Sequence, residues 1–176
     1  MRTKLEEITP LGLDLDEPLP LAFCEDALPE RCGLAADGIG HAILHLSREG
    51  ERVTVTGRAD MPTAGDCAKC LTPIRPKIRA ELDITLFPAL AGAAKPIEQE
   101  VLAADVGSGE HDGKTVEWGE LVREELALNV PMVSWCKADC RGLCATCGVN
   151  RNLTDCDCDA KRIDPRWEKL KLVKLE

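Results

Sequence analysis

The stretch Lys77-Ile-Arg-Ala-Glu-Leu-Asp-Ile-Thr-Leu-Phe87 alternates apolar side chains with charged or polar ones. Because successive side chains of a strand point to opposite faces of a sheet, this pattern predicts a strand with one dry and one wet face. Residues 39–46 and 52–57, joined by a polar turn at Gly50, predict two further strands. A sheet with one face in water is typical of antiparallel pairing, so we expect an antiparallel sheet.

One helix is predicted to cover the dry face of this sheet. Trp118, Val122 and Leu126 recur at helical spacing, and Pro131 closes the segment because proline cannot continue a helix. These residues predict a helix over positions 117–129. Weaker patterns elsewhere predict an irregular N-terminal region of about 35 residues. The expected fold class is therefore α+β, an antiparallel sheet packed by one helix.

Two minor strands are also expected, one near residues 11–15 and one at the sheet edge over residues 98–106. His41 and His45 share a strand face, where we expect hydrogen-bonded or solvated side chains rather than metal ligands. His111 lies in a glycine-flanked segment that predicts a solvated loop. No nucleophile elbow and no phosphate-binding glycine loop is present, so we expect neither an enzyme nor a small-molecule substrate.

The charge of the chain limits its partners. The 176 residues carry 31 acidic and 22 basic side chains, a net charge of −9, and the average field of such a protein repels nucleic acid. No run of 18 apolar residues is present and the N-terminus lacks an apolar signal stretch, so we expect a cytoplasmic protein with no membrane partner. Residues 160–176 differ, with six basic and three acidic side chains.

Ten cysteines are the main feature of the composition. In a reducing compartment, clustered cysteines indicate metal binding or redox chemistry. Two pairs, Cys67-Ala-Lys-Cys70 and Cys144-Ala-Thr-Cys147, have the two-residue gap that lets both thiolates reach one zinc ion. Cys24 and Cys32 lie outside the clusters and are predicted to be buried as small apolar side chains.

The last cysteines form a compact set. Cys144 and Cys147 are followed by Cys156 and Cys158, which together supply the four thiolates of a structural zinc site. Cys67 and Cys70 need two more ligands, and counting makes Cys136 and Cys140 the candidates. Cys140 can instead join the set that follows it, so the sequence leaves one or two zinc ions open. A second alternative is a thiol redox or metal-handling protein that uses its paired cysteines.

The composition shift after Ser134 divides the chain into two predicted parts. Residues 1–133 are expected to form the sheet and helix domain, and residues 134–176 a cysteine-rich zinc-binding tail. The dipeptide Asp164-Pro165 predicts the start of a terminal helix over residues 165–174, because aspartate accepts hydrogen bonds from the first amides and proline fits the first turn.

These motifs resemble those of the YceD family. The resemblance rests on Cys136-x3-Cys140-Arg-Gly-Leu-Cys144-x2-Cys147-Gly-x-Asn150, on Cys156-x-Cys158, and on Asp164-Pro-Arg-Trp-x-x-Leu170. It also includes Cys67-x2-Cys70-Leu71 before the alternating strand and the helix that runs into Pro131. Trp167 is bulkier than the family's usual residue. The likeness covers residues 40–176.

The resemblance implies a non-enzymatic factor that supports accumulation of large-subunit (23S) ribosomal RNA and ribosome assembly. Some members lack the C-terminal cysteines, which implies that metal there supports the tail. The implied partner is the large-subunit RNA or its precursor particle. The negative charge of the sheet domain leaves a basic ribosomal protein open as the alternative partner. The candidate RNA contacts are the cations at and beyond the cysteine cluster, namely Arg141, Arg151, Arg162, Arg166, Lys169 and Lys171.

Overall fold

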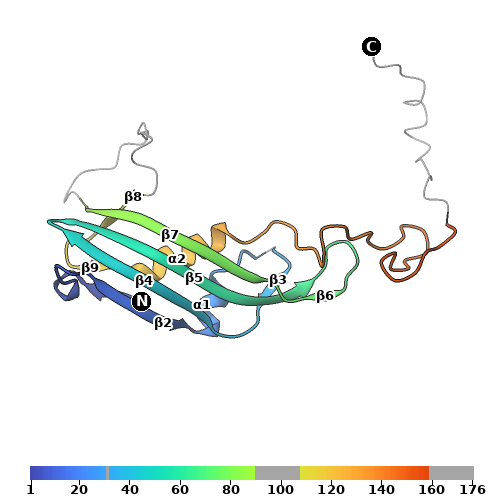
Figure 1. The fold of residues 1–176 in the computed structure, drawn as a ribbon, viewed down its shortest axis with the longest axis horizontal. Helices are drawn as coiled ribbons and strands as arrows, with labels where there is room; N and C mark the ends of the chain where they lie inside the picture. Colours follow the sequence, from blue (N-terminus) through green and yellow to red (C-terminus); the bar gives the residue numbers. More distant parts are fainter. Residues whose placement is uncertain (31, 90–107, 159–176) are drawn as a thin grey trace, which may run out of the picture. The chain divides into compact units, whose positions relative to one another are not determined.

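The computed structural model describes residues 1–30, 32–89 and 108–158 (Figure 1). The edge strand expected over residues 98–106 and the helix expected over 165–174 lie outside these residues. The described elements, in chain order, are β1 (Thr3–Lys4), the 3-10 helix η1 (Leu5–Glu7), β2 (Leu13–Leu19), α1 (Leu21–Asp26), β3 (Leu34–Ala36), β4 (Gly40–Glu49), β5 (Arg52–Asp66), β6 (Pro73–Ile74), β7 (Lys77–Pro88), β8 (Ser108–His111), β9 (Thr115–Val116) and α2 (Trp118–Leu128).

The chain divides into two compact units. Unit 1 contains Met1–Gly65 and Arg75–Val133, and unit 2 contains Asp66–Ile74 and Ser134–Glu176. The predicted division placed its boundary between residues 133 and 134, and it assigned residues 66–74 to the sheet domain. In the structure this short segment belongs with the cysteine-rich part of the chain.

A sheet with the strand order β2-β4-β5-β7-β8 forms unit 1, and β3 pairs with β5. The pairs β2–β4, β4–β5 and β5–β7 are antiparallel, and Val55 at the centre lies opposite Leu46 and Ile84. The strands predicted over residues 39–46, 52–57 and 77–87 are confirmed. Strand β5 is longer than predicted because its alternation continues through Ala59 and Met61.

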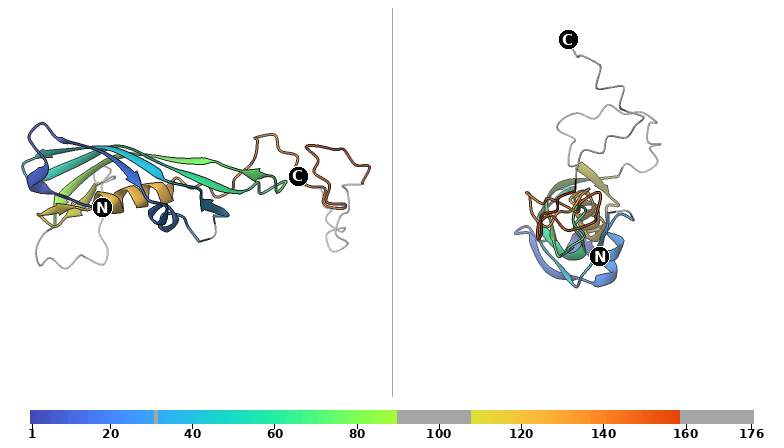
Figure 2. Two further views of the ribbon diagram at one scale, coloured as in Figure 1. Left: turned by 90° about the horizontal axis from the view of Figure 1, so that it is seen from below. Right: turned by 90° about the vertical axis from the view of Figure 1, so that its right-hand side faces the viewer.

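The core lies between one face of this sheet and the helices. Figure 2 shows α1 and α2 on the same side of the sheet. Alternate residues of the central strands and one face of α2 are buried there: Leu44, Leu46, Val53, Val55, Ile78, Leu82, Trp118, Val122 and Leu126. The dry face predicted for residues 77–87 and the apolar side predicted for the helix are confirmed. The fold class is α+β, mostly sheet with one main helix.

Helix α2 ends close to its predicted boundary. Its last turn is closed by Asn129, whose side-chain Nδ2 donates a hydrogen bond to the carbonyl oxygen of Glu125 at 2.8 Å. The backbone amide of Asn129 donates to the same oxygen at 3.1 Å, so the carbonyl group of Glu125 accepts both a backbone and a side-chain hydrogen bond at the end of the helix. None of the described helices is long and apolar enough to cross a membrane.

The structure corrects two expectations about irregular segments. The N-terminal region is not irregular: it contains the helix α1 and the seven-residue strand β2, which overlaps the strand expected near residues 11–15 and pairs along its length with β4. The segment predicted as a loop near residue 111 contains β8, which pairs with β7 in parallel, so the sheet is not wholly antiparallel. Tertiary pairing explains β8, since its own sequence carries little alternation.

His111 is buried, contrary to the prediction of a solvated side chain. Its Nε2–H donates to the carbonyl oxygen of Glu51 at 2.7 Å, and the amide of Gly113 donates to its Nδ1 at 3.0 Å. Both ring nitrogens therefore have backbone partners, which explains how an imidazole is accommodated at the end of β8.

Gly57 in β5 gives the first testable prediction. Its φ is +146°, and a Cβ at this position would collide with the carbonyl oxygen of Ile43 on β4. Gly57→Ala is therefore expected to lower the free energy of unfolding by about 2 kcal/mol or more, measured by urea denaturation. Gly50→Ala is the matched control: its φ is +64°, but no atom lies within 4 Å of the added carbon. Equal losses for the two variants would show that backbone strain alone, without the collision, sets the cost.

Candidate metal centres in the second unit

The first cysteine pair lies in a tight turn between β5 and β6. The amide of Leu71 donates to the carbonyl oxygen of Cys67 at 2.9 Å, and the amide of Cys67 donates to the carbonyl oxygen of Thr72 at 2.9 Å. Leu71 adopts a φ of +55°, the one non-glycine residue with positive φ among the described residues. These two bonds hold the side chains of Cys67 and Cys70 on the same side of the turn.

The second cysteine pair lies in a turn with the same hydrogen bonds. The amide of Gly148 donates to the carbonyl oxygen of Cys144 at 2.9 Å, and the amide of Cys144 donates to the carbonyl oxygen of Val149 at 2.8 Å. Gly148 has a φ of +74° and occupies the place that Leu71 has in the first turn. Glycine reaches this conformation without steric cost, so Gly148 was recognisable from sequence, whereas the role of Leu71 was missed.

The first group of four thiols combines Cys67 and Cys70 with Cys136 and Cys140. All four sulfur atoms lie within 4.8 Å of one another. The Sγ atoms of Cys67 and Cys140 are 3.8 Å apart, and those of Cys70 and Cys136 are 3.5 Å apart. A zinc ion with four sulfurs at its usual bond length needs edges of about 3.8 Å, so this group fits the ion. The structure places the sulfur of Cys140 with this group and not with the later set.

The second group contains Cys144, Cys147, Cys156 and Cys158, whose sulfur atoms also lie within 4.8 Å of one another. Its cysteines are half-buried or exposed, whereas three of the four in the first group are buried. These two groups are the arrangements found among the described residues that can hold a metal ion. Their composition of thiolates alone suits zinc and leaves no ligand position for a substrate.

One thiol in each group is easily ionised. Burial raises the pKa of Cys67, but hydrogen bonds from the amides of Cys136, Lys69 and Cys70 outweigh it and lower that pKa to about 6. The amides of Cys147 and Thr146 lower the pKa of Cys144 to about 6. Backbone amides thus stabilise the thiolate form that a metal ion requires.

A second thiol in each group holds its proton more tightly. Burial, followed by the hydrogen bond with Cys70, raises the pKa of Cys136 to about 12. The hydrogen bond with Cys147, followed by burial, raises the pKa of Cys158 to about 12. Without a cation the neighbouring sulfurs cannot all ionise, because like charges repel, so binding of a metal ion would release protons.

The two remaining cysteines lie in unit 1. Cys24 is fully buried in the core, as predicted. Cys32 is half-buried, and its Sγ–H donates to the carbonyl oxygen of Leu34 at 3.3 Å. Neither joins a group of metal-binding side chains among the described residues.

The structure covers two of the six candidate RNA contacts. Arg141 forms an ion pair with Asp155 at 2.6 Å, and the backbone amide of Arg151 donates to Gly142. The other four candidates, Arg162, Arg166, Lys169 and Lys171, lie outside the described residues. Lys69 was not among the predicted contacts; its Nζ lies 4.1 Å from the ring centre of the half-exposed Trp135.

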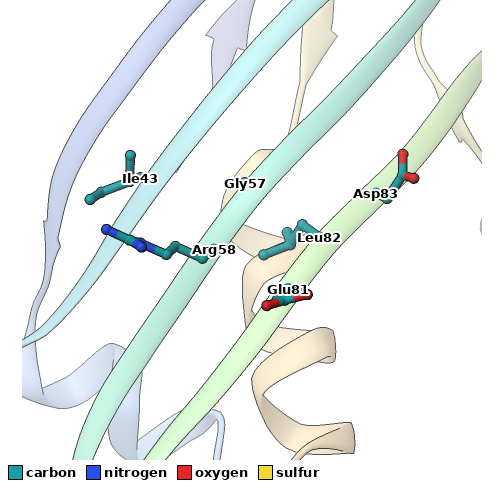
Figure 3. Close-up of a pocket in the computed structure, with 6 residues that line it drawn as sticks. All are labelled: Ile43, Gly57, Arg58, Glu81, Leu82 and Asp83. Atoms are coloured by element: carbon teal, nitrogen blue, oxygen red, sulfur yellow. The ribbon is translucent and has the colours of Figure 1, made fainter.

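The open face of the unit 1 sheet carries charges of both signs. His41 and His45 contact Asp16 and Asp14, at 3.0 and 2.7 Å, and form no group with metal-binding geometry among the described residues. Figure 3 shows a pocket on the sheet, lined by Ile43, Gly57, Arg58, Glu81, Leu82 and Asp83.

Comparison with known proteins identifies the chain's relatives. Residues 55–174 match the family described as the large ribosomal RNA subunit accumulation protein YceD. The chain belongs to the YceD family. It is also similar to uncharacterized proteins of Mycobacterium bovis and Mycobacterium tuberculosis, 31% identical over 148 residues that cover 81% of this chain and 68% of theirs.

A relative in Mycobacterium leprae, also uncharacterized, is 29% identical over 127 residues, which cover 72% of this chain and 55% of the relative. No solved structure matches the chain. The YceD match includes β7, α2 and all eight clustered cysteines, so the family assignment and the metal-binding geometry concern the same residues.

Proposed function

We propose that the protein is a non-enzymatic factor for accumulation of large-subunit ribosomal RNA, in which two structural zinc ions stabilise unit 2. The family description supplies the process. The observation that carries the rest is the pair of four-thiol groups, each with sulfurs within 4.8 Å. Zinc with four thiolate ligands has no open position to activate water, so its role is to fix the fold.

The geometry favours zinc over thiol redox chemistry. A redox pair needs two sulfurs that can close to a bond of about 2.05 Å, with one nucleophilic thiolate accessible. Here both CxxC pairs are joined by two further cysteines at distances that suit a tetrahedron, and Cys67 is fully buried. Burial would shield a reactive Cys67 from a disulfide on another molecule.

Charge supports a basic protein as the direct partner of unit 1. The described residues of unit 1 carry 20 acidic and 10 basic side chains. Those of unit 2 carry four of each, and two zinc tetrathiolates would add four negative charges. An acidic surface attracts basic ribosomal proteins and repels RNA, so direct RNA contact is confined to the basic residues near the C-terminus.

Crosslinking in growing cells tests this function. We expect the tagged protein to be recovered with precursors of the large ribosomal subunit. Replacing acidic residues of the open face, in the variant Asp16→Asn/Glu81→Gln/Asp83→Asn, is expected to reduce this recovery several-fold, because the attraction to a basic partner is weakened.

The matched control neutralises the tail, in the variant Arg166→Ala/Lys169→Ala/Lys171→Ala, which is expected to keep its association with the particle. A different result would be that only the tail variant is no longer recovered with the precursor particles, while the wild-type protein crosslinks to one region of large-subunit RNA. That result would show that the protein binds RNA directly and would contradict the proposed contact with a basic protein. Absence of wild-type protein from all precursor particles would contradict the proposed function itself.

A further inference from the structure

Two asparagines of the second cysteine loop contact the first cysteine group. Asn150 and Asn152 lie between Cys147 and Cys156, the inner cysteines of the second group. The side-chain Nδ2 of Asn152 donates to the sulfur of Cys140 at 3.3 Å, although Cys140 belongs to the first group. A loop held by one candidate metal site therefore supplies a hydrogen bond to a ligand of the other.

All polar atoms of the Asn152 side-chain amide form hydrogen bonds. Its Nδ2 donates its second hydrogen to Oδ1 of Asn150 at 2.9 Å, and its Oδ1 accepts the amide of Arg141 at 2.9 Å. Oδ1 of Asn150 accepts a further bond from the backbone amide of Asn152 at 3.0 Å. With donors and acceptor all engaged, the amide has one orientation, in which N–H faces the Cys140 sulfur.

Asn150 reaches a second sulfur of the first group through a hydroxyl. Its Nδ2 donates to Oγ1 of Thr72 at 3.4 Å, and Oγ1 of Thr72 lies 3.3 Å from the sulfur of Cys70. When Cys70 is a thiolate, the hydroxyl hydrogen can be donated to the sulfur. Two of the four sulfurs in the first group thus depend on the loop of the second group.

The backbone of the loop is fixed by the second group's own turn. Cys144 donates its amide to Val149, directly before Asn150, and Leu143 forms a β-bridge with Asn150. Gly142, with a φ of +72°, lets the bridged segment of Leu143 and Asn150 approach the turn that contains Cys67 and Cys70. A Cβ at position 142 would lie 3.0 Å from the carbonyl oxygen of Lys69 in that turn. Ordering of the second site consequently orders the donors that serve the first.

We propose that Asn150 and Asn152 couple the two metal sites, so that zinc at the second site raises the zinc affinity of the first. This inference rests on the proposed zinc binding. Hydrogen bonds to ligand sulfurs stabilise the thiolate form, and loss of such outer contacts lowers metal affinity by about 10–100-fold. By linkage, zinc at the first site raises the affinity of the second by the same factor.

The test measures zinc affinity of the first site in the full-length reduced chain by competition with a chelator. Four proteins form a cycle: wild type, Cys156→Ser/Cys158→Ser, Asn152→Ala, and the combination of all three substitutions. Disabling the second site is expected to weaken the first about 10–100-fold, and Asn152→Ala to weaken it by a similar factor. In the Asn152→Ala background, the serine substitutions should then add less than about threefold, because the direct bond to the Cys140 sulfur is gone and only the longer link through Asn150 and Thr72 remains.

A spectroscopic measurement separates a hydrogen bond to sulfur from a merely structural role. At saturating ¹¹³Cd²⁺, Asn152→Ala and the nearly isosteric Asn152→Asp should both shift the ¹¹³Cd resonance of the first site, since both lack the N–H donor. Asn129→Ala is the matched control, because its amide bonds to Glu125 in α2, and it should leave affinity and resonance unchanged.

Equal first-site affinity with and without the second site, or full additivity of the Asn152 and serine substitutions, would overturn the coupling while leaving zinc binding intact. A wild-type chain that binds no zinc at all would instead overturn the proposed zinc sites, and the coupling with them.

Discussion

Cys67→Ser is expected to reduce the zinc content from two ions per chain to one and to unfold the part of unit 2 that surrounds the first group. The reason is that Cys67 is fully buried and its sulfur lies 3.8 Å from that of Cys140, so a serine leaves three thiolates and a buried hydroxyl around the ion. Structural zinc contributes about 10–16 kcal/mol of apparent binding free energy, far more than any single contact in so small a unit. Elemental analysis and amide hydrogen exchange measure the two effects.

Cys32→Ser is the matched control, since Cys32 lies outside both groups and should leave zinc content and exchange unchanged. Cys158→Ser should remove the second ion and leave the core of unit 1 protected. Retention of two zinc ions by the Cys67 variant would contradict the assignment of the first group. Loss of protection throughout unit 1 in the Cys158 variant would contradict the division into two units.

Leu126→Ala is expected to destabilise unit 1 by about 3–5 kcal/mol, the range for a fully buried leucine whose removal leaves a cavity. Leu126 is 0% exposed and lies in the core shared by α2 and the sheet. Thermal or urea unfolding, followed by the circular dichroism of the sheet, measures the loss.

Leu128 provides the comparison within the same helix, because it is 78% exposed. Leu128→Ala should change the free energy of unfolding by less than about 0.5 kcal/mol. Similar losses from the two leucines would mean that α2 packs through a different face from the one in the structure.

The parts of the fold that were predictable carry their own periodicity. The alternation from Lys77 to Phe87 specifies a strand with one buried face, and Trp118, Val122 and Leu126 specify the buried side of α2. Strand β8 was not predictable, because a four-residue segment with Gly109 and Glu110 shows no alternation and forms only by pairing with β7. The burial of His111 follows from the same pairing.

The sequence alone predicted which cysteines belong to the candidate metal sites. Spacing identified each CxxC pair, and counting suggested Cys136 and Cys140 as partners of the first pair. Cys67 and Cys140 are 73 residues apart along the chain, and no sequence pattern near either residue predicts that their sulfur atoms lie close together. Only the structure shows which cysteine group contains Cys140. The link through Asn150 and Asn152 was also hidden, because asparagines in a polar loop are typical of ordinary turns.

The sulfurs of the first group come from positions separated by 66 and 73 residues along the chain. Ribosomes add about 5–20 residues per second, so Cys67 precedes Cys140 by about 4–15 s during synthesis. Throughout this interval only Cys67 and Cys70 are present, and two thiolates do not complete a four-ligand zinc site. If the group holds zinc as proposed, the site is incomplete until Cys136 and Cys140 have been synthesised, and metal binding is a late step in the maturation of each newly made molecule.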